Sequence, residues 1–372
     1  HPQSMRSQCG KQQPESGFSL PEIGGNMKAL LYAAAAAAAL TCASSGSAQN
    51  SPIKLKISYQ FPEHHFVTVG CVNPFIKGVE DRLPGRVVFE RYPAEQLAKA
   101  FNQLDSVRNR VADIGIHNLA YTPQNTPLST FLELPGIFGF DDTLAAQRAW
   151  DRLAKTDLVK AEFAKLNVVP AWVFVTSPYQ FQMTGSEPIT KLDQLKGKKL
   201  RVPGAGAEMA LNLIGAVGVR VPASDLYLAI QRGTVDGSII STSALPAYKL
   251  DEVVNSISTN ASWGASPFIA AMNESRWKGL PEDVRQAITE AGVAAGEACA
   301  KTYIDLETKE NDRLRSKGKT LFQLPDAFAD ALNDALQPLR DDWLSQMKQR
   351  GLDGQVILNK YAQYLKEAKA QQ

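Results

Sequence analysis

The chain has 372 residues, with 40 Lys and Arg against 38 Asp and Glu, and a formal net charge of +2. With 21% charged residues it is neither a highly charged disordered chain nor a protein with a long basic stripe, so we expect no nucleic-acid partner. The 26 Gly and 21 Pro also exclude collagen-like and low-complexity classes. At roughly 150 residues per domain, the length predicts two globular domains.

The beginning of the chain differs from the rest. Residues 29–40 are entirely apolar and a small polar cluster follows them, but a bilayer span needs roughly 20 apolar residues. We therefore predict a signal peptide over 27–48, cleaved after Ala48, behind an upstream extension over 1–26. Cys42 raises a lipoprotein alternative, but the residue before it fits a lipobox poorly. The mature protein is then expected in the periplasm, exported by a cleaved signal peptide.

Two cysteines, Cys71 and Cys299, remain after this cleavage. In an oxidising compartment they could form a disulfide. The sequence does not show that their side chains approach to bonding distance. We therefore expect two separate buried thiols, with the disulfide as the alternative.

The first part of the mature chain alternates between strand and helix patterns. Residues 53–58 and 86–92 alternate apolar and polar side chains, as half-buried strands do, and 113–116 form a short buried strand. Helical patterns over 67–82 and 95–109 lie between them. This β-α-β-α-β order predicts a largely parallel sheet with crossover helices.

A second α/β unit follows about a hundred residues later. Its two predicted helices span 208–215 and 224–232, and its predicted strands are 168–176, 199–202, 219–221 and 236–240. Two such units predict two α/β lobes, with a cleft between them at the carboxyl ends of the strands.

The last part of the chain is helical. An apolar stripe predicts a helix from about Pro281 to Ser316, much longer than the mean of about 11–12 residues. A coiled coil is the alternative, but Gly292 and Gly296 interrupt any heptad pattern. We expect this helix to brace both lobes, with two more helices over about 326–349 and 355–370.

Motifs for catalysis and metal binding are missing. The sequence contains no G-x-S-x-G, H-E-x-x-H or C-x-x-C motif and no P-loop. Gly204 and Gly206 stand between a strand and a helix, as in a dinucleotide turn, but Met209 occupies the third glycine position. His64, His65 and His117 are expected at the surface or a pocket rim rather than around a metal. We therefore predict no cofactor and no enzymatic activity, with an exported enzyme as a rival hypothesis.

Arg201 is the informative charged residue. It lies at the end of a predicted strand, a few residues before a predicted helix. A guanidinium there offers planar, bidentate recognition of a carboxylate, and a helix N-terminus adds favourable potential for an anion. An internal salt bridge is the alternative.

Residues 195–237, LKGKKLRVPGAGAEMALNLIGAVGVRVPASDLYLAIQRGTVDG, closely resemble the signature region of the solute-binding proteins of TRAP (tripartite ATP-independent periplasmic) transporters. Segments 85–115, 134–140 and 277–288 resemble further blocks of that family. The resemblance implies capture of a small organic acid and its delivery to a permease with small and large membrane subunits. It also implies that Arg201 clamps the ligand carboxylate.

The family's fold is a two-lobe periplasmic binding protein fold with crossing strands and a long helix bracing both lobes. On this sequence it implies lobe I over 52–177 with 266–305, and lobe II over 178–265 with 306–366. We expect a monomer. The alternative is a ligand-sensing periplasmic protein that serves a receptor.

Two positions depart from the family pattern. Phe181 stands where many relatives have a second arginine, and Ile240 stands where an asparagine is common. Both changes remove polar contacts, so we expect a monocarboxylate with an apolar or aromatic body. For the aromatic candidates, core packing is the alternative. The other predicted wall residues are Gln60, Phe61, His65, Asn118, Gln180, Ser241, Trp263 and Phe268.

Overall fold

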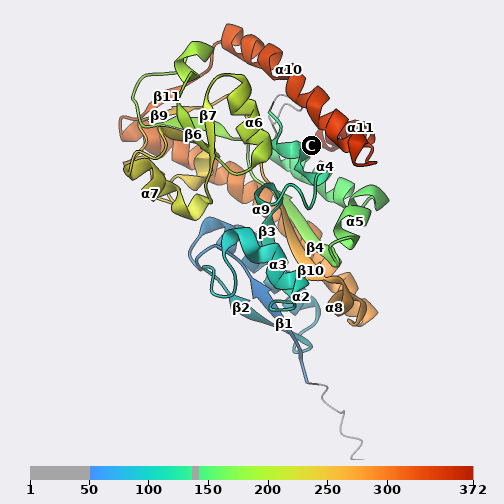
Figure 1. Ribbon diagram of the computed structural model, residues 1–372. Coiled ribbons are helices and arrows are strands. Elements are labelled where there is room, and N and C mark those ends of the chain that lie inside the picture. Colours follow the sequence, from blue (N-terminus) through green and yellow to red (C-terminus); the bar gives the residue numbers. More distant parts are fainter. Residues whose placement is uncertain (1–50, 136–141, 372) are drawn as a thin grey trace, which may run out of the picture. The chain divides into compact units, whose positions relative to one another are not determined.

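The computed structural model describes residues 51–135 and 142–371 (Figure 1). The predicted upstream extension, the signal peptide and residues 136–140 of the 134–140 block lie outside the described residues. Among the helices that are described, none combines the length and the apolar character that crossing a membrane requires.

The first sheet has five strands in the order β2-β1-β3-β10-β4. Strands β1, β2 and β3 run parallel, as predicted, and β10 runs antiparallel to both β3 and β4. In β1 the buried apolar Leu55 and Ile57 alternate with exposed lysines, whereas every residue of β3 is buried. The strands are β1 (Ile53–Ser58), β2 (Val87–Tyr92), β3 (Ile114–Asn118), β4 (Val168–Val175) and β10 (Pro267–Asn273).

The predicted helix over 67–82 is present in two parts. A π-helical turn, η1 (Thr68–Val72), continues into α2 (Asn73–Arg82). The predicted helix over 95–109 is wrong in its first half: only η2 (Ala100–Asn102) and α3 (Gln103–Arg108) form there. Glu95 adopts a positive φ of 63°, and its carboxylate accepts a hydrogen bond from the backbone N–H of Ala100 at 2.8 Å. This turn delays the start of the helix.

The second sheet has six strands in the order β11-β9-β5-β8-β6-β7. Strands β6, β7 and β8 are parallel, and β5 is antiparallel to β8 and β9. Helices α6 (Ala205–Leu213) and α7 (Leu226–Gln231) connect the parallel strands. The strands are β5 (Gln180–Met183), β6 (Lys199–Val202), β7 (Val217–Arg220), β8 (Gly237–Ile240), β9 (Ser256–Ser258) and β11 (Thr320–Phe322).

The chain passes between the two sheets along a pair of hydrogen-bonded segments. The backbone N–H of Thr176 donates to the carbonyl of Ser266 at 3.1 Å, and that of Tyr179 donates to the carbonyl of Gly264 at 2.8 Å. One segment follows β4 and leads to β5; the other follows β9 and leads to β10. These are the predicted crossing strands.

Helix α9 (Glu282–Ser316) is 35 residues long and ends where the sequence predicts. It packs against α2 and β4 at the first sheet and against β11 at the second. Gly292 allows the close approach to β4, because a Cβ there would lie 2.6 Å from the Cβ of Trp172. The glycines that interrupt a heptad pattern therefore serve helix-to-sheet packing.

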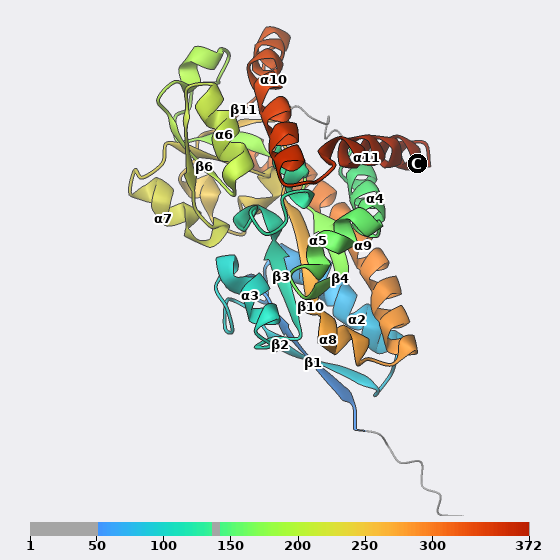
Figure 2. The ribbon, with the colours of Figure 1, turned by 45° about the vertical axis from the view of Figure 1, so that its right-hand side comes forward.

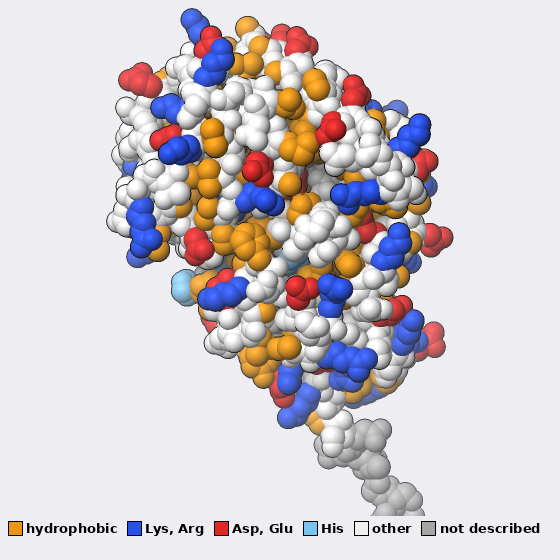
Figure 3. All heavy atoms as spheres, in the orientation of Figure 1, with side chains coloured by type: hydrophobic (Ala, Val, Ile, Leu, Met, Phe, Trp, Pro, Cys, Tyr) orange, Lys and Arg blue, Asp and Glu red, His pale blue; other side chains and the backbone are white. Residues whose placement is uncertain are grey.

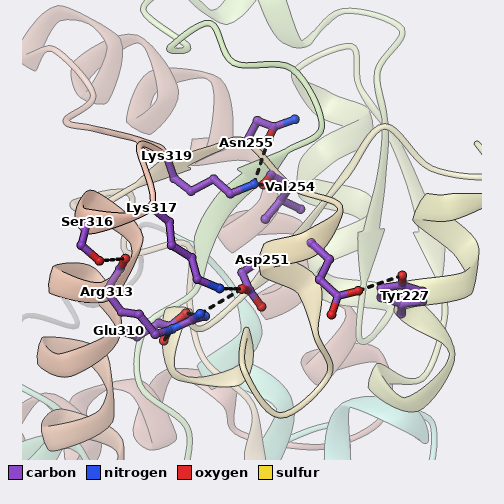
Figure 4. A network of polar contacts seen from close by, with 10 residues as sticks. Tyr227, Asp251, Val254, Asn255, Glu310, Arg313, Ser316, Lys317 and Lys319 are labelled. Atoms are coloured by element: carbon purple, nitrogen blue, oxygen red, sulfur yellow. Dashed lines mark hydrogen bonds and ion pairs between the residues drawn. The ribbon is translucent and has the colours of Figure 1, made fainter.

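A polar network holds the end of α9 beside the second sheet (Figure 4). The carboxylate of Asp251 accepts hydrogen bonds from Arg313 at 2.9 Å and from Lys317 at 2.6 Å. Lys319 donates to the carbonyl of Val254 at 2.8 Å. Asp251 is buried, so the pairing also compensates the loss of its hydration.

Cys71 and Cys299 form a disulfide, with their Cα atoms 4.5 Å apart, so the expectation of separate thiols is wrong. The bond joins η1 to α9. These elements lie close together because Gly70 has no side chain: a Cβ there would lie 2.3 Å from the hydroxyl oxygen of Thr302. The sequence pattern does not reveal this approach.

The last two helices pack on different parts of the molecule. Helix α10 (Asp326–Gln349) packs against α6, whereas α11 (Gly354–Lys369) lies along α4 (Thr143–Ala154), as both ribbon views show (Figures 1 and 2). The guanidinium of Arg152 on α4 lies 4.0 Å from the ring centre of Tyr364 on α11. Helix α11 ends the segment 306–366, which was predicted as part of lobe II. It packs instead on α4, which precedes β4 of the first sheet.

The remaining short elements connect these parts. On the face that Figure 3 shows, acidic and basic side chains are interspersed, in keeping with the small net charge. The short helices are α5 (Asp157–Ala164), α8 (Glu274–Lys278), η3 (Leu119–Tyr121), η4 (Ser129–Glu133), η5 (Leu192–Leu195), η6 (Ala223–Asp225), η7 (Thr242–Ala244) and η8 (Leu250–Glu252).

Candidate functional site

A cavity is lined by residues from both sheets and from α9. Several of these residues follow the carboxyl ends of parallel strands β1, β3 and β8, where α/β proteins commonly bind ligands. The lining residues are Gln60, Phe61, His65, Phe66, Val67, Asn118, Tyr121, Thr176, Tyr179, Arg201, Ala223, Ile240, Ser241, Ala244, Tyr248, Phe268 and Tyr303.

Arg201 is the charged group of this cavity. It lies on β6, and only 2% of its surface is exposed. Its Nε donates to the carbonyl of Val221 at 2.7 Å, and its Nη1 donates to the carbonyl of Ile239 at 3.4 Å. Within the described ranges no Asp or Glu lies at ion-pair distance from it, so the internal salt bridge considered from the sequence does not form there.

Two backbone carbonyls use only part of the donor capacity of a guanidinium, which has five N–H groups in a fixed fork. They orient the side chain while leaving its charge without an anionic partner in the described part of the chain. A buried, oriented cation of this kind matches the two oxygens of a carboxylate.

Aromatic rings form much of the remaining wall. The ring of Phe61 lies 4.8 Å from that of His65 and 6.0 Å from that of Phe268. Phe268 is supported from behind by Phe174, stacked at 4.6 Å. Tyr248 comes from the other sheet and lies 5.1 Å from the His65 ring. This wall favours a flat, apolar ligand body.

Two neutral polar residues interrupt the aromatic wall. His65 is 4% exposed, and its Nδ1 accepts a hydrogen bond from the backbone N–H of Val67 at 3.1 Å. Its buried Nε2 has no hydrogen-bond partner among the described residues, and neither has Oε1 of Gln60, which is 7% exposed. Burial, with a smaller contribution from His64, lowers the pKa of His65 to about 3. The imidazole is therefore neutral at physiological pH.

Glu133 is a buried ionisable residue near Arg201. Both carboxyl oxygens are buried without a hydrogen-bond partner among the described residues. They lie at the start of α6, where a Cβ on Gly204 would be 2.6 Å from Oε1. Burial raises the pKa of Glu133 to about 8, although the charges of Arg201 and Arg220 oppose the shift. This carboxyl is therefore mainly protonated at neutral pH.

Eight of the predicted wall residues line the cavity, with Arg201 among them. Three of them follow β1 and two lie at the end of β8. A position at the end of a predicted strand was therefore the feature that identified cavity residues from the sequence. The eight are Gln60, Phe61, His65, Asn118, Arg201, Ile240, Ser241 and Phe268.

Three predicted residues lie outside the cavity lining, and their placement corrects the prediction. The ring of Phe181 is fully buried against Trp263 at 5.0 Å and faces Phe328 of α10. Oε1 of Gln180 accepts hydrogen bonds from Ser258 and from the backbone of Ala261, both at 2.9 Å. These side chains therefore serve the core and the sheet, which was the alternative interpretation for Trp263.

Sequence reasoning missed the tyrosines of the cavity and overlooked Glu133. Tyr121, Tyr179, Tyr248 and Tyr303 come from four separate segments, so no local pattern joins them. Burial raises the pKa of Tyr179, Tyr248 and Tyr303, and these phenols stay neutral. The glycines at 204 and 206 were the available signal for Glu133, since they make room for it.

Within the described residues, no cluster of three or more His, Cys, Asp or Glu side chains is placed to hold a metal ion. The arrangement has instead one oriented cation, an aromatic wall and contributions from two sheets joined by crossing strands. These features define a binding protein for a small anion. Residues 57–346 match the family model DctP, bacterial extracellular solute-binding protein, family 7, and the chain belongs to this family.

Relatives support this assignment over most of the chain. The chain is 30% identical to the outer membrane transporter protein TsaT of Comamonas testosteroni, over 90% of this chain and 97% of TsaT. It is 25% identical to the C4-dicarboxylate-binding periplasmic protein DctP of Rhodobacter capsulatus, over 84% and 93% of the two chains.

Solved structures share the fold. A TRAP solute-binding protein from Rhodoferax ferrireducens T118, with copurified benzoate, has a TM-score of 0.79 at 23% identity, over 86% of this chain and 99% of that chain. One from Bordetella bronchiseptica, with bound (R)- and (S)-mandelate, has a TM-score of 0.77 at 21% identity, over 85% and 99%. The predicted fold class and the resemblance to TRAP solute-binding proteins are thereby confirmed.

Proposed function

We propose that the protein captures an aromatic monocarboxylate in the periplasm and delivers it to a TRAP-type transporter with small and large membrane subunits. The observation that carries the proposal is Arg201, a buried guanidinium oriented by two backbone carbonyls and facing an aromatic-lined cavity. A ligand carboxylate supplies the anionic partner that this cation lacks among the described residues. The protein acts by binding, without chemical turnover.

The lining favours one carboxylate over two. Arg201 is the single Lys or Arg among the described residues that line the cavity. A second carboxylate of a C4-dicarboxylate would lose its hydration there without gaining a cation, which is costly. An aromatic ring instead gains roughly 25 cal/mol for each Å² of apolar surface removed from water. The benzoate and mandelate found with two structural relatives are acids of this kind.

Binding between the sheets gives a mechanism for signalling occupancy. A ligand held by Arg201 of the second sheet and by Phe268 of the first contacts both sides at once. Because these contacts exist together only when the sides are close, the ligand favours a closed form. The crossing strands are the hinge of this motion. The lobes have the boundaries predicted from the sequence, except that α11 belongs with α4. The protein acts as an exported monomer.

Replacing Arg201 by Ala tests the proposal. We expect the affinity for benzoate to fall by about 30-fold or more, because losing one partner of a buried charge pair costs about 2–5 kcal/mol. Isothermal titration calorimetry measures this, and circular dichroism with thermal melting checks the fold. Arg201→Lys is the matched control, since it keeps the charge and loses the fork, and we expect an intermediate affinity. Benzoate binding by Arg201→Ala at wild-type affinity would refute the assignment.

A further inference from the structure

The side of the cavity that follows β1 contains two buried polar atoms without partners among the described residues. They are Nε2 of His65 and Oε1 of Gln60. Both residues line the cavity and are more than nine-tenths buried. Buried polar atoms in native proteins are nearly always hydrogen-bonded to protein, ordered water or ligand, so these two atoms are available to a group bound in the cavity.

The hydrogen-bonding role of His65 follows from its contacts. Nδ1 accepts the backbone N–H of Val67 at 3.1 Å and therefore carries no proton. In a neutral imidazole the other nitrogen then carries the hydrogen, so Nε2 is a donor. The low pKa of about 3 that burial gives His65 keeps the ring in this neutral form.

Other polar groups of the cavity are already engaged. Asn118 donates to the hydroxyl of Ser266 at 3.0 Å and accepts the backbone N–H of Ala120 at 3.0 Å. The hydroxyl of Thr176 accepts the backbone N–H of Ser266 at 3.0 Å. Tyrosine hydroxyls can rotate to donate or to accept, so they do not discriminate between ligand groups. Among the described residues that line the cavity, Nε2 of His65 and Oε1 of Gln60 are the buried side-chain atoms without any partner.

A hydroxyl group has the chemistry to pair with both atoms, because it accepts one hydrogen bond and donates another. An ether accepts only, and a halogen or methyl group offers no comparable donor. Phe61 lies beside His65 and Phe268 lies beside Phe61, so a ligand group that reaches His65 also meets aromatic rings.

We propose, building on the proposed function, that the ligand is a hydroxylated aromatic carboxylate whose hydroxyl accepts a hydrogen bond from His65 and donates one to Gln60. The carboxylate pairs with Arg201 on the second sheet, and the hydroxyl bonds to residues that follow β1 of the first sheet. The two ends of the ligand thus bind different sheets. His65 and Gln60 determine selectivity among acids that Arg201 admits.

Calorimetry on the purified protein tests this with benzoate, the three hydroxybenzoates and the three methoxybenzoates. We expect at least one hydroxybenzoate to bind about 10-fold or more tighter than benzoate, a difference of about 1.4 kcal/mol. The matching methoxybenzoate should show no such gain, because it has no hydrogen to donate to Gln60. Equal affinities for benzoate and all hydroxybenzoates would overturn the inference and indicate that water satisfies the two atoms.

A matched pair of variants assigns the preference to His65. In His65→Asn the amide oxygen can still accept the Val67 N–H, but no donor stands at the Nε2 position. The ratio of hydroxybenzoate affinity to benzoate affinity should therefore fall to about 1. In His65→Gln the longer side chain places an NH₂ group near that position, so most of the preference should remain. Gln60→Met removes the second partner at similar size and should also reduce the preference. Circular dichroism and thermal melting show whether each variant is folded, and the ratio of hydroxybenzoate to benzoate affinity within each variant is the readout.

The outcomes separate this inference from the proposed function. A preference that survives both His65→Asn and Gln60→Met would overturn the inference while leaving Arg201 as the carboxylate site. If none of the aromatic acids binds the wild-type protein, the proposed function fails, and the inference fails with it. Arg201→Ala should lose benzoate and hydroxybenzoates alike, whereas His65→Asn should abolish the preference for a hydroxybenzoate, measured as the ratio of the two affinities.

Discussion

The two sides of the cavity differ in chemistry. The second sheet contributes the cation Arg201, whose position is set by the carbonyls of Val221 and Ile239. The first sheet contributes aromatic rings and the neutral donor and acceptor of His65 and Gln60. Charge on one side sets which class of ligand can enter, and neutral hydrogen bonds on the other side select within that class. A ligand must contact both sides to use both kinds of selectivity.

The two sides are also held differently. The first-sheet segment that contains His65 continues into η1, which a disulfide joins to α9. No covalent link among the described residues holds Arg201 in the same way. The disulfide therefore fixes the first-sheet side of the cavity against α9.

Removing the disulfide is the strongest way to break this difference. For Cys71→Ala/Cys299→Ala, with a sequence separation of 228 residues, we expect a loss of about 5 kcal/mol in the free energy of unfolding. The reason is that the reduced unfolded chain gains conformational freedom. Urea denaturation followed by circular dichroism measures the loss, and wild-type protein in reductant is the control. An unchanged midpoint would show that the bond does not constrain the chain.

Two phenylalanines, one near each sheet, sharpen the comparison. Phe181→Ala removes a ring packed on Trp263 and Phe328, and should cost about 3–5 kcal/mol of stability with little change in benzoate affinity. Phe268→Ala removes a ring of the cavity wall and should weaken benzoate about 10- to 30-fold, or about 1.4–2 kcal/mol. Melting temperatures and calorimetric affinities separate the two effects. A larger loss of affinity in Phe181→Ala than in Phe268→Ala would contradict the placement of the rings.

The sequence predicts the charged side of the site better than the aromatic side. Arg201 sits in a local motif of strand, turn and helix, whose geometry places it at a sheet edge. The tyrosines gather from distant segments, so only the folded chain brings them together. Phe181 was misplaced because a departure from a family pattern does not show which face of β5 carries the ring.

The fold shows the same division between local and long-range information. Periodicity predicts α9 to its last residue, since an apolar stripe is a local signal. The disulfide and the packing of α11 on α4 depend on contacts between remote segments. The pair Gly204 and Gly206 resembled a nucleotide-binding turn, but the glycines accommodate Glu133.

Glu133 connects the two sides of the comparison. Its helix η4 follows β3 of the first sheet along the chain, and its carboxyl lies against Gly204 at the start of α6 beside the second sheet. The positive charges of Arg201 and Arg220 lower the pKa of Glu133, and Arg220 is itself paired with Glu208 at 3.1 Å. Tyr179 is the further titratable group whose pKa responds to Glu133.

The pKa of Glu133 sets the direction of a pH effect. It is about 8 in the folded protein against an ordinary value of 4.5, so the folded state binds more protons than the unfolded state between these pH values. Stability therefore falls as pH rises through this window, by up to about 1.4 kcal/mol per pH unit from this group. Glu133→Gln, which is neutral and similar in size, should remove this slope and be more stable than wild type above pH 8. Urea denaturation of both proteins at pH 5, 7 and 9 measures this difference. Parallel pH profiles for the two proteins would mean that Glu133 is already ionised without penalty. Arg201 would then be the partner of Glu133 rather than of the ligand carboxylate.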